Sequence, residues 1–89
     1  MEKLVVFGSN YCPVTQAALT KLKVNDIKCE FKNISGELKN LKEFLKIRDT
    51  HTLFNEIRET GRIGIPCFVW GKDEISLDIG KVLARGNKF

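Results

Sequence analysis

Three cysteines are the residues of this chain with the most distinctive chemistry, and they stand far apart, at Cys12, Cys29 and Cys67. No C-x-x-C pair or histidine cluster accompanies them, so neither a disulfide framework nor a zinc site is expected. Cys12 stands directly before a proline where a helix is expected to begin. Unpaired N–H groups and the helix dipole favour a thiolate there. Cys12 is therefore predicted to be a nucleophile; the alternative is a small buried apolar residue.

The first half of the chain predicts the elements that position Cys12. Residues 4–7 are uniformly apolar, as in a strand covered on both faces, and a Gly-Ser-Asn turn follows. A helix is expected from Pro13 to about Lys23. Residues 27–32 then alternate between apolar and charged, which predicts a strand with Cys29 on its buried side. Burial raises the pKa of a thiol, so Cys29 is predicted to be structural. Strand, helix and strand together predict a parallel βαβ unit.

The middle of the chain is expected to be helical, with a break near Asp49. Apolar residues at helical spacing predict a helix that runs to about Ile47: Leu38, Leu41, Phe44 and Leu45. A second stretch, capped by Asp49 or Thr50, is expected to end at Gly61. The lone His51 is expected to have a surface or capping role.

The last third of the chain predicts a hairpin followed by a helix. Residues 63–70 are apolar and include Pro66, which cannot donate to a strand ladder and therefore belongs at the strand start. A turn over residues 71–73 is short enough to make the next strand, about residues 74–77, antiparallel. Asp78 is expected to cap a final helix, which ends near Gly86.

Composition favours one domain over residues 1–89, since 89 residues with 43% hydrophobic content can bury one core. No apolar run is long enough to cross a bilayer, and the first residues resemble no leader, so a cytoplasmic protein is expected. The net charge is +4, but Lys39, Lys42 and Lys46 recur as a solvated helix face does, so nucleic-acid binding is not expected. A mild positive field favours small anionic substrates.

Two separated motifs within this order of elements resemble the glutaredoxins, a family with the thioredoxin fold. The family's C-P-Y-C matches Cys12, Pro13, Val14 and Thr15, with Tyr11 just ahead. Its T-G-x-x-T-V-P stretch, whose proline is cis, matches residues 60–66. The resemblance covers the whole chain and implies an α/β, thioredoxin-like fold with a four-stranded mixed sheet and helices on both faces.

The resemblance also implies a function, that of a glutathione-dependent thiol–disulfide oxidoreductase with glutathione as co-substrate and no metal. Its partners would be glutathione and glutathionylated or disulfide-bonded proteins, and it would act as a monomer in electron transport and cell redox homeostasis. Catalytic roles are carried over to Cys12 and Thr15. Glutathione-binding roles are carried over to Tyr11, Pro13, Val14, Ile65, Pro66, Leu77 and Asp78.

Several positions depart from the family pattern. Thr15 replaces the second cysteine, so the chemistry is expected to be monothiol; Thr15 either donates its hydroxyl to the thiolate or only caps the helix. Ser9 stands where family members often carry Lys or Arg. Ser76 and Leu77 replace a pair of glycines that helps to hold glutathione. Weaker glutathione binding is therefore expected.

Other interpretations remain open. Some monothiol glutaredoxins carry an iron–sulfur cluster as dimers, although those usually have C-G-F-S where this chain has Pro13 and Val14 after Cys12. A thioredoxin-fold interaction module without redox activity is a third possibility. Cys67 follows the motif proline directly, so it is an alternative resolving thiol. Similar proteins of anaerobic bacteria use selenocysteine at the position of Cys12, which the coding sequence would reveal.

Overall fold

The computed structural model describes residues 3–71, 74–86 and 88–89. Its elements are, in order, β1 (Val5–Gly8), α1 (Pro13–Val24), β2 (Glu30–Asn33), α2 (Leu38–Thr50), the 3-10 helix η1 (Thr52–Phe54), α3 (Asn55–Thr60), β3 (Cys67–Val69), β4 (Ile75–Ser76) and α4 (Ile79–Arg85). The strands form one mixed sheet in the order β2-β1-β3-β4. β1 and β2 are parallel, whereas β3 runs antiparallel to both β1 and β4. The expected α/β fold with a four-stranded mixed sheet is confirmed.

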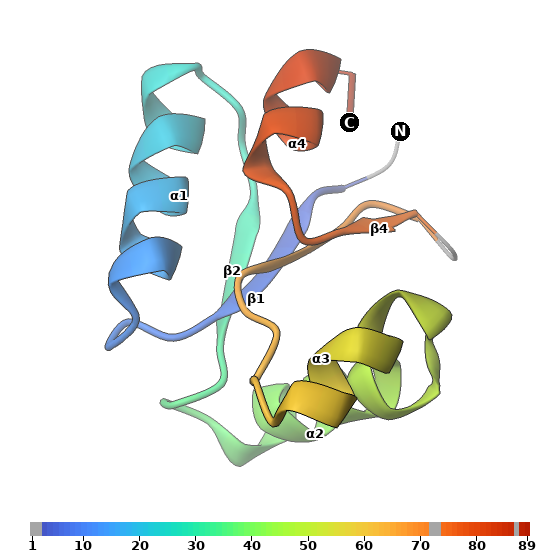
Figure 1. Cartoon of the computed structure of the whole chain (residues 1–89). Coiled ribbons are helices and arrows are strands. Elements are labelled where there is room, and N and C mark those ends of the chain that lie inside the picture. Colours follow the sequence, from blue (N-terminus) through green and yellow to red (C-terminus); the bar gives the residue numbers. More distant parts are fainter. Residues whose placement is uncertain (1–2, 72–73, 87) are drawn as a thin grey trace.

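One face of the sheet is covered by α1 and α4, which Figure 1 shows on the same side. The apolar side chains on this face exclude water because they interlock across the layers. Val6 and Phe68 come from the strands, Leu4 and Trp70 adjoin the ends of β1 and β3, and the helices contribute Ala18, Leu22 and Val82. This core packs α1 against the sheet, and four residues separate the end of β1 from the start of α1.

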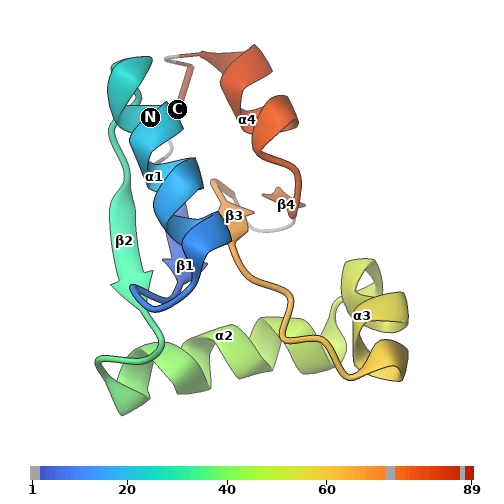
Figure 2. The ribbon, with the colours of Figure 1, turned by 60° about the vertical axis from the view of Figure 1, so that its left-hand side comes forward.

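The opposite face is covered by α2, η1 and α3, as the turned view in Figure 2 shows. Phe44 of α2 and Phe54 of η1 are fully buried, with their rings edge to face at 5.9 Å. Phe7 of β1 and Cys67 of β3 point into this second core. Among the described residues, no helix is both long and apolar enough to span a bilayer.

β2 begins later than the alternation of residues 27–32 predicts. The Ile27 N–H donates to the carbonyl of Leu22 at 2.9 Å, and Asp26 takes a φ of 55°. These contacts belong to the turn that ends α1. The residues between this turn and Glu30 therefore form a loop and not the first part of the strand. Ile27 is nevertheless buried, and Cys29 is half-buried against the same core, as the alternation predicts.

The break in the middle of the chain lies at His51, and the predicted cap at Asp49 or Thr50 is wrong. Both residues are still helical, because α2 continues to Thr50, whose hydroxyl donates to the carbonyl of Lys46. His51 is the cap of η1, and its Nδ1 accepts the Leu53 N–H at 3.1 Å. His51 therefore has the capping role expected of it.

The hairpin and the last helix follow the prediction with shorter strands. β3 begins directly after Pro66, and the Trp70 N–H donates to the Glu74 carbonyl across the hairpin. Of the predicted turn, Lys72 and Asp73 lie outside the described residues. The Asp78 carboxylate accepts the Gly80 N–H at 2.8 Å and so caps α4, which ends at Gly86 with a φ of 61°.

Candidate active site around Cys12

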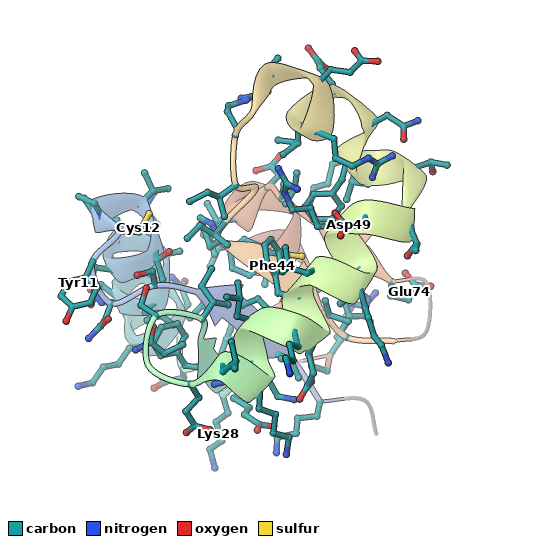
Figure 3. All side chains as sticks on the ribbon, turned by 90° about the horizontal axis from the view of Figure 1, so that it is seen from below. Tyr11, Cys12, Lys28, Phe44, Asp49 and Glu74 are labelled. Carbon is teal, nitrogen blue, oxygen red and sulfur yellow. The ribbon has the colours of Figure 1, made fainter. Side chains whose placement is uncertain are left out.

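Cys12 is the residue at which α1 begins. Its backbone is extended, and the proline expected at the first helical position follows it. The Cys12 N–H donates to the Ser9 carbonyl at 3.0 Å, and the Cys12 carbonyl accepts the Gln16 N–H at 3.1 Å. Figure 3 shows Cys12 and the exposed Tyr11 together at the outer end of α1. The thiol is half-buried, so a substrate disulfide has access to it.

The surroundings of the sulfur favour the thiolate. The Cys12 side chain makes no capping hydrogen bond at the start of α1. The pKa of Cys12 is lowered, chiefly because the Thr15 hydroxyl stands where it can donate to a thiolate, and then because the N–H groups of Thr15 and Val14 do. Partial desolvation opposes these effects. A thiolate accepts hydrogen bonds more strongly than a thiol does. Donors near the sulfur therefore stabilise the negative charge that Cys12 gains when it ionises.

Thr15 is held rigidly in its donor position. Its side chain is fully buried, and Oγ1 accepts the Ser9 N–H at 3.4 Å, which leaves the hydroxyl proton for the sulfur. Gly8 makes this placement possible, since a Cβ there would lie 2.5 Å from Thr15 Cγ2. Thr15 Oγ1 accepts the N–H of Ser9 and not an N–H of α1, so of the two roles left open for Thr15 this geometry favours donation to the thiolate.

The loop before Cys12 is tied to the loop that follows β2. Ser9 is buried, with its Oγ 2.5 Å from the Ser35 Oγ and accepting the Tyr11 N–H at 3.1 Å. The Asn10 N–H donates to the Asn33 side chain at 3.3 Å. The side chain at position 9 therefore points inward between two loops.

Four of the predicted binding residues line one groove beside the start of α1: Val14, Ile65, Pro66 and Leu77. The groove has a volume of about 180 Å³. Tyr11 and Pro13 lie exposed next to it rather than in its lining. The groove thus brings together the two sequence motifs and the segment before α4.

The segment before β3 lines this groove and has unpaired backbone groups. The Ile65–Pro66 peptide bond is cis, as the resemblance implies. Within the described part of the chain, no hydrogen bond engages the N–H or C=O of Ile65. Gly64 has a φ of 92°, and a Cβ on it would lie 2.7 Å from the Phe54 ring, so glycine is required there.

Asp78 is more constrained than the sequence suggests. Its N–H donates to the Ser76 Oγ at 3.0 Å, while its carboxylate caps α4. Ser76 therefore engages the N–H of Asp78, a residue to which the resemblance gives a glutathione-binding role. Leu77 contributes its side chain to the groove.

The other two cysteines have unreactive surroundings. Burial raises the pKa of Cys67 to about 12, and it raises the pKa of Cys29 as well. Cys67 is fully buried in the core that α2 covers, whereas Cys12 begins α1 on the other face. All three cysteines are free thiols. Among residues 3–71, 74–86 and 88–89, no three His, Cys, Asp or Glu side chains are grouped to hold a metal ion.

Sequence reasoning missed part of the groove, namely Ala17, Ala18, Lys21, Phe68 and Ile79. The signal for the helical part was present, because Val14, Ala17, Ala18 and Lys21 recur at three, four and seven positions and so share a helix face. Of these, Lys21 carries the chemical information, since it adds a cation to an otherwise apolar lining.

Comparisons with known proteins place the chain beside a relative of undefined function. No protein-family model matches it, and neither does any solved structure at a significant level. A protein of Haemophilus influenzae, described only as uncharacterized, is 28% identical over 82 residues, which cover 92% of this chain and 95% of that protein. The similarity extends over nearly the full length of both chains and indicates a distant homologue that shares the whole domain.

Proposed function

We propose that this chain is a glutaredoxin-like thiol–disulfide oxidoreductase with a thioredoxin-like fold, in which Cys12 is the nucleophile and glutathione the co-substrate. The observation that carries the proposal is the lowered pKa of a half-buried cysteine at the start of α1, caused by the Thr15 hydroxyl and two N–H groups. Its substrates are glutathionylated or disulfide-bonded proteins. A thiol chemistry of this kind suits a reducing compartment such as the cytoplasm.

The reaction needs one protein thiol and two glutathione molecules. The Cys12 thiolate attacks the glutathione sulfur of a mixed disulfide, the S–S bond breaks, and the target thiolate leaves. A second glutathione thiolate then attacks the glutathione sulfur bound to Cys12. Glutathione disulfide forms, and Cys12 leaves as the thiolate that began the cycle. The net reaction consumes one free glutathione, whose sulfur is oxidised into glutathione disulfide together with the glutathione released from the mixed disulfide, while the target sulfur is reduced to a thiol.

The groove supports a placement for glutathione. The unengaged N–H and C=O of Ile65 offer the pairing edge that an extended peptide uses as an added strand. Val14, Pro66 and Leu77 supply apolar contacts on either side. Tyr11 and Pro13 are exposed beside Cys12, where a substrate approaches. The occupied Asp78 N–H supports the expectation of weak glutathione binding.

A glutathione-coupled assay on a mixed disulfide tests this proposal. The native chain and its Cys29→Ser variant are expected to turn over, whereas Cys12→Ser is expected to fall to the uncatalysed rate. Activity in Cys12→Ser would refute the assignment of the nucleophile. Alkylation with a thiol reagent checks that Cys12 is reduced in the assay. If it is reduced and the native chain still shows no turnover, the function itself is refuted.

A further inference from the structure

The connection between α3 and β3, residues 61–66, carries the unpaired backbone groups of Ile65. The sheet does not hold this connection, because β3 begins only at Cys67. The backbone hydrogen bonds of the turn after α3 end with the Arg62 N–H. The side chain of Ile63 is 56% exposed, so its packing contributes little. The direction of the Ile65 edge therefore depends on contacts from another element.

Arg48 of α2 supplies these contacts, at the place where Figure 2 shows the connection passing beside that helix. Its Nη2 donates to the Arg62 carbonyl at 2.7 Å, and its Nε donates to the Ile63 carbonyl at 2.9 Å. Two donors on one planar guanidinium fix both the position and the orientation of what they hold. Nη1 lies 3.5 Å from Asp49 Oδ1, and the Arg48 side chain is only 20% exposed, so the guanidinium is itself held in place.

The next residue, Gly64, limits the connection in a different way. A Cβ at this position would lie 2.7 Å from the Phe54 ring, so the backbone lies directly against that ring. This contact sets how close the connection lies to the helices, whereas the Arg48 hydrogen bonds set which way its carbonyls face. Ile65 follows Gly64 directly. The orientation of its N–H and C=O therefore depends on the hydrogen bonds that Arg48 makes just before it.

We infer that Arg48 is a positioning residue that makes the site selective for glutathionyl disulfides, because it orients the Ile65 edge toward the peptide groups of glutathione. This inference rests on the proposed function and concerns the substrate specificity of the same site. Arg48 does not act on the nucleophile, since the pKa of Cys12 is lowered by the donors of Thr15 and Val14. Loss of Arg48 should therefore weaken recognition of glutathione and leave the reactivity of the thiolate unchanged.

The experiment compares two mixed disulfides of one target peptide, one with glutathione and one with cysteamine, which has no peptide group to pair with Ile65. The readout is the second-order rate constant at which the reduced chain releases the peptide thiol, without free glutathione, and Cys12→Ser gives the blank. The native chain is expected to favour the glutathione form. Arg48→Gln should lower this preference by about threefold to tenfold, the effect of about one peptide hydrogen bond, with the cysteamine rate near native.

Three further variants sharpen the result. Arg48→Lys keeps a cation and its donors without the planar fork, so its preference should fall between those of the native chain and Arg48→Gln. Lys46→Gln removes one exposed positive charge from the same helix and should keep the native preference. Arg58→Gln also removes hydrogen bonds to two carbonyls, those of Arg48 and His51, but these lie at the end of α2 and not in residues 61–66. Its preference should stay near native even where a denaturant titration shows lost stability.

The outcomes separate this inference from the proposed function. An unchanged preference in Arg48→Gln, or an equal fall in Lys46→Gln or Arg58→Gln, overturns the inference and leaves the oxidoreductase standing. An equal loss of rate with both disulfides, or a shifted pH–rate profile, assigns Arg48 to the nucleophile and also overturns it. If Arg48→Gln does not fold, Arg48→Lys carries the same test with a smaller expected fall. A native rate no faster than that of Cys12→Ser with either disulfide overturns the inference and the proposed function together.

Discussion

Cys12 and Cys67 belong to opposite sides of the same sheet and have opposite environments. Cys12 begins the helix that covers one face, where donors at the helix start lower its pKa. The side chain of Cys67 is buried among Phe7, Phe44 and Phe54 on the other face, where burial raises its pKa to about 12. Both cysteines stand next to a proline in the sequence. Proximity to a motif therefore does not make a thiol reactive; the donors around its sulfur and its contact with solvent do.

The largest expected effect concerns stability at alkaline pH and depends on Cys67. Its thiol stays protonated in the folded chain after an unfolded thiol, with a pKa of about 8.5, has ionised, so the unfolded state binds fewer protons and stability falls as pH rises. Between pH 8 and 10 this linkage removes about 2 kcal/mol. Denaturant titrations at both pH values should show that Cys67→Ala loses less stability over this interval than the native chain.

Cys29→Ala is the matched control for that measurement, because burial raises the pKa of Cys29 as well but the residue is only half-buried. It should relieve the alkaline loss less than Cys67→Ala does. An equal alkaline loss in Cys67→Ala and the native chain would mean that Cys67 ionises as freely as in an unfolded chain, and the contrast between the two faces would fail.

The next effect concerns the donor beside Cys12. Thr15→Val keeps the shape of the side chain but removes the hydroxyl, so the pKa of Cys12 should rise and turnover near pH 7 should slow by up to about tenfold. Thr15→Ser retains the hydroxyl and should stay near the native rate. The pH–rate profile is the decisive readout: in Thr15→Val its rising limb should shift to higher pH. An unshifted limb would leave Thr15 with a structural role only.

The smallest effect concerns Ser76. Its Oγ occupies the Asp78 N–H, so Ser76→Ala and Ser76→Gly both release that donor, and the glycine also removes the Cβ. One added hydrogen bond should lower the glutathione KM by about twofold to tenfold. Steady-state kinetics of the two variants separate the loss of the hydrogen bond from the loss of the Cβ. A lower glutathione KM in Ser76→Gly but not in Ser76→Ala would indicate that the Cβ obstructs glutathione. A higher KM in both stably folded variants would mean that this N–H does not meet glutathione.

Local sequence patterns were sufficient for much of the fold. The strand before the Gly-Ser-Asn turn, the proline at the start of α1 and the Asp78 cap each depend on neighbours in sequence, and the structure has all three. The helix boundary near Asp49 was misplaced because two capping residues and a histidine compete within three positions. The cap lies at His51 because the helical hydrogen bonds of α2 continue to Thr50.

The candidate site was less predictable because its details depend on contacts between distant segments. Cys12 followed from the helix start alone. The inward side chain of Ser9 depends on its contact with Ser35, 26 residues further on. The groove combines α1 with residues near Pro66 and Ile79, so the helical spacing that groups Lys21 with Val14 does not by itself show that Lys21 lines a groove.

The most direct test of the account is the ionisation of each thiol in variants that keep one cysteine and carry Ala at the other two positions. The ultraviolet absorbance of the thiolate, followed against pH on the folded chain, reports each ionisation separately. The account predicts that the Cys12 variant ionises at the lowest pH and the Cys67 variant only at the alkaline end of the range. Ionisation of Cys12 at or above the pH for Cys29 would contradict the central claim, that the start of α1 makes Cys12 the reactive thiol.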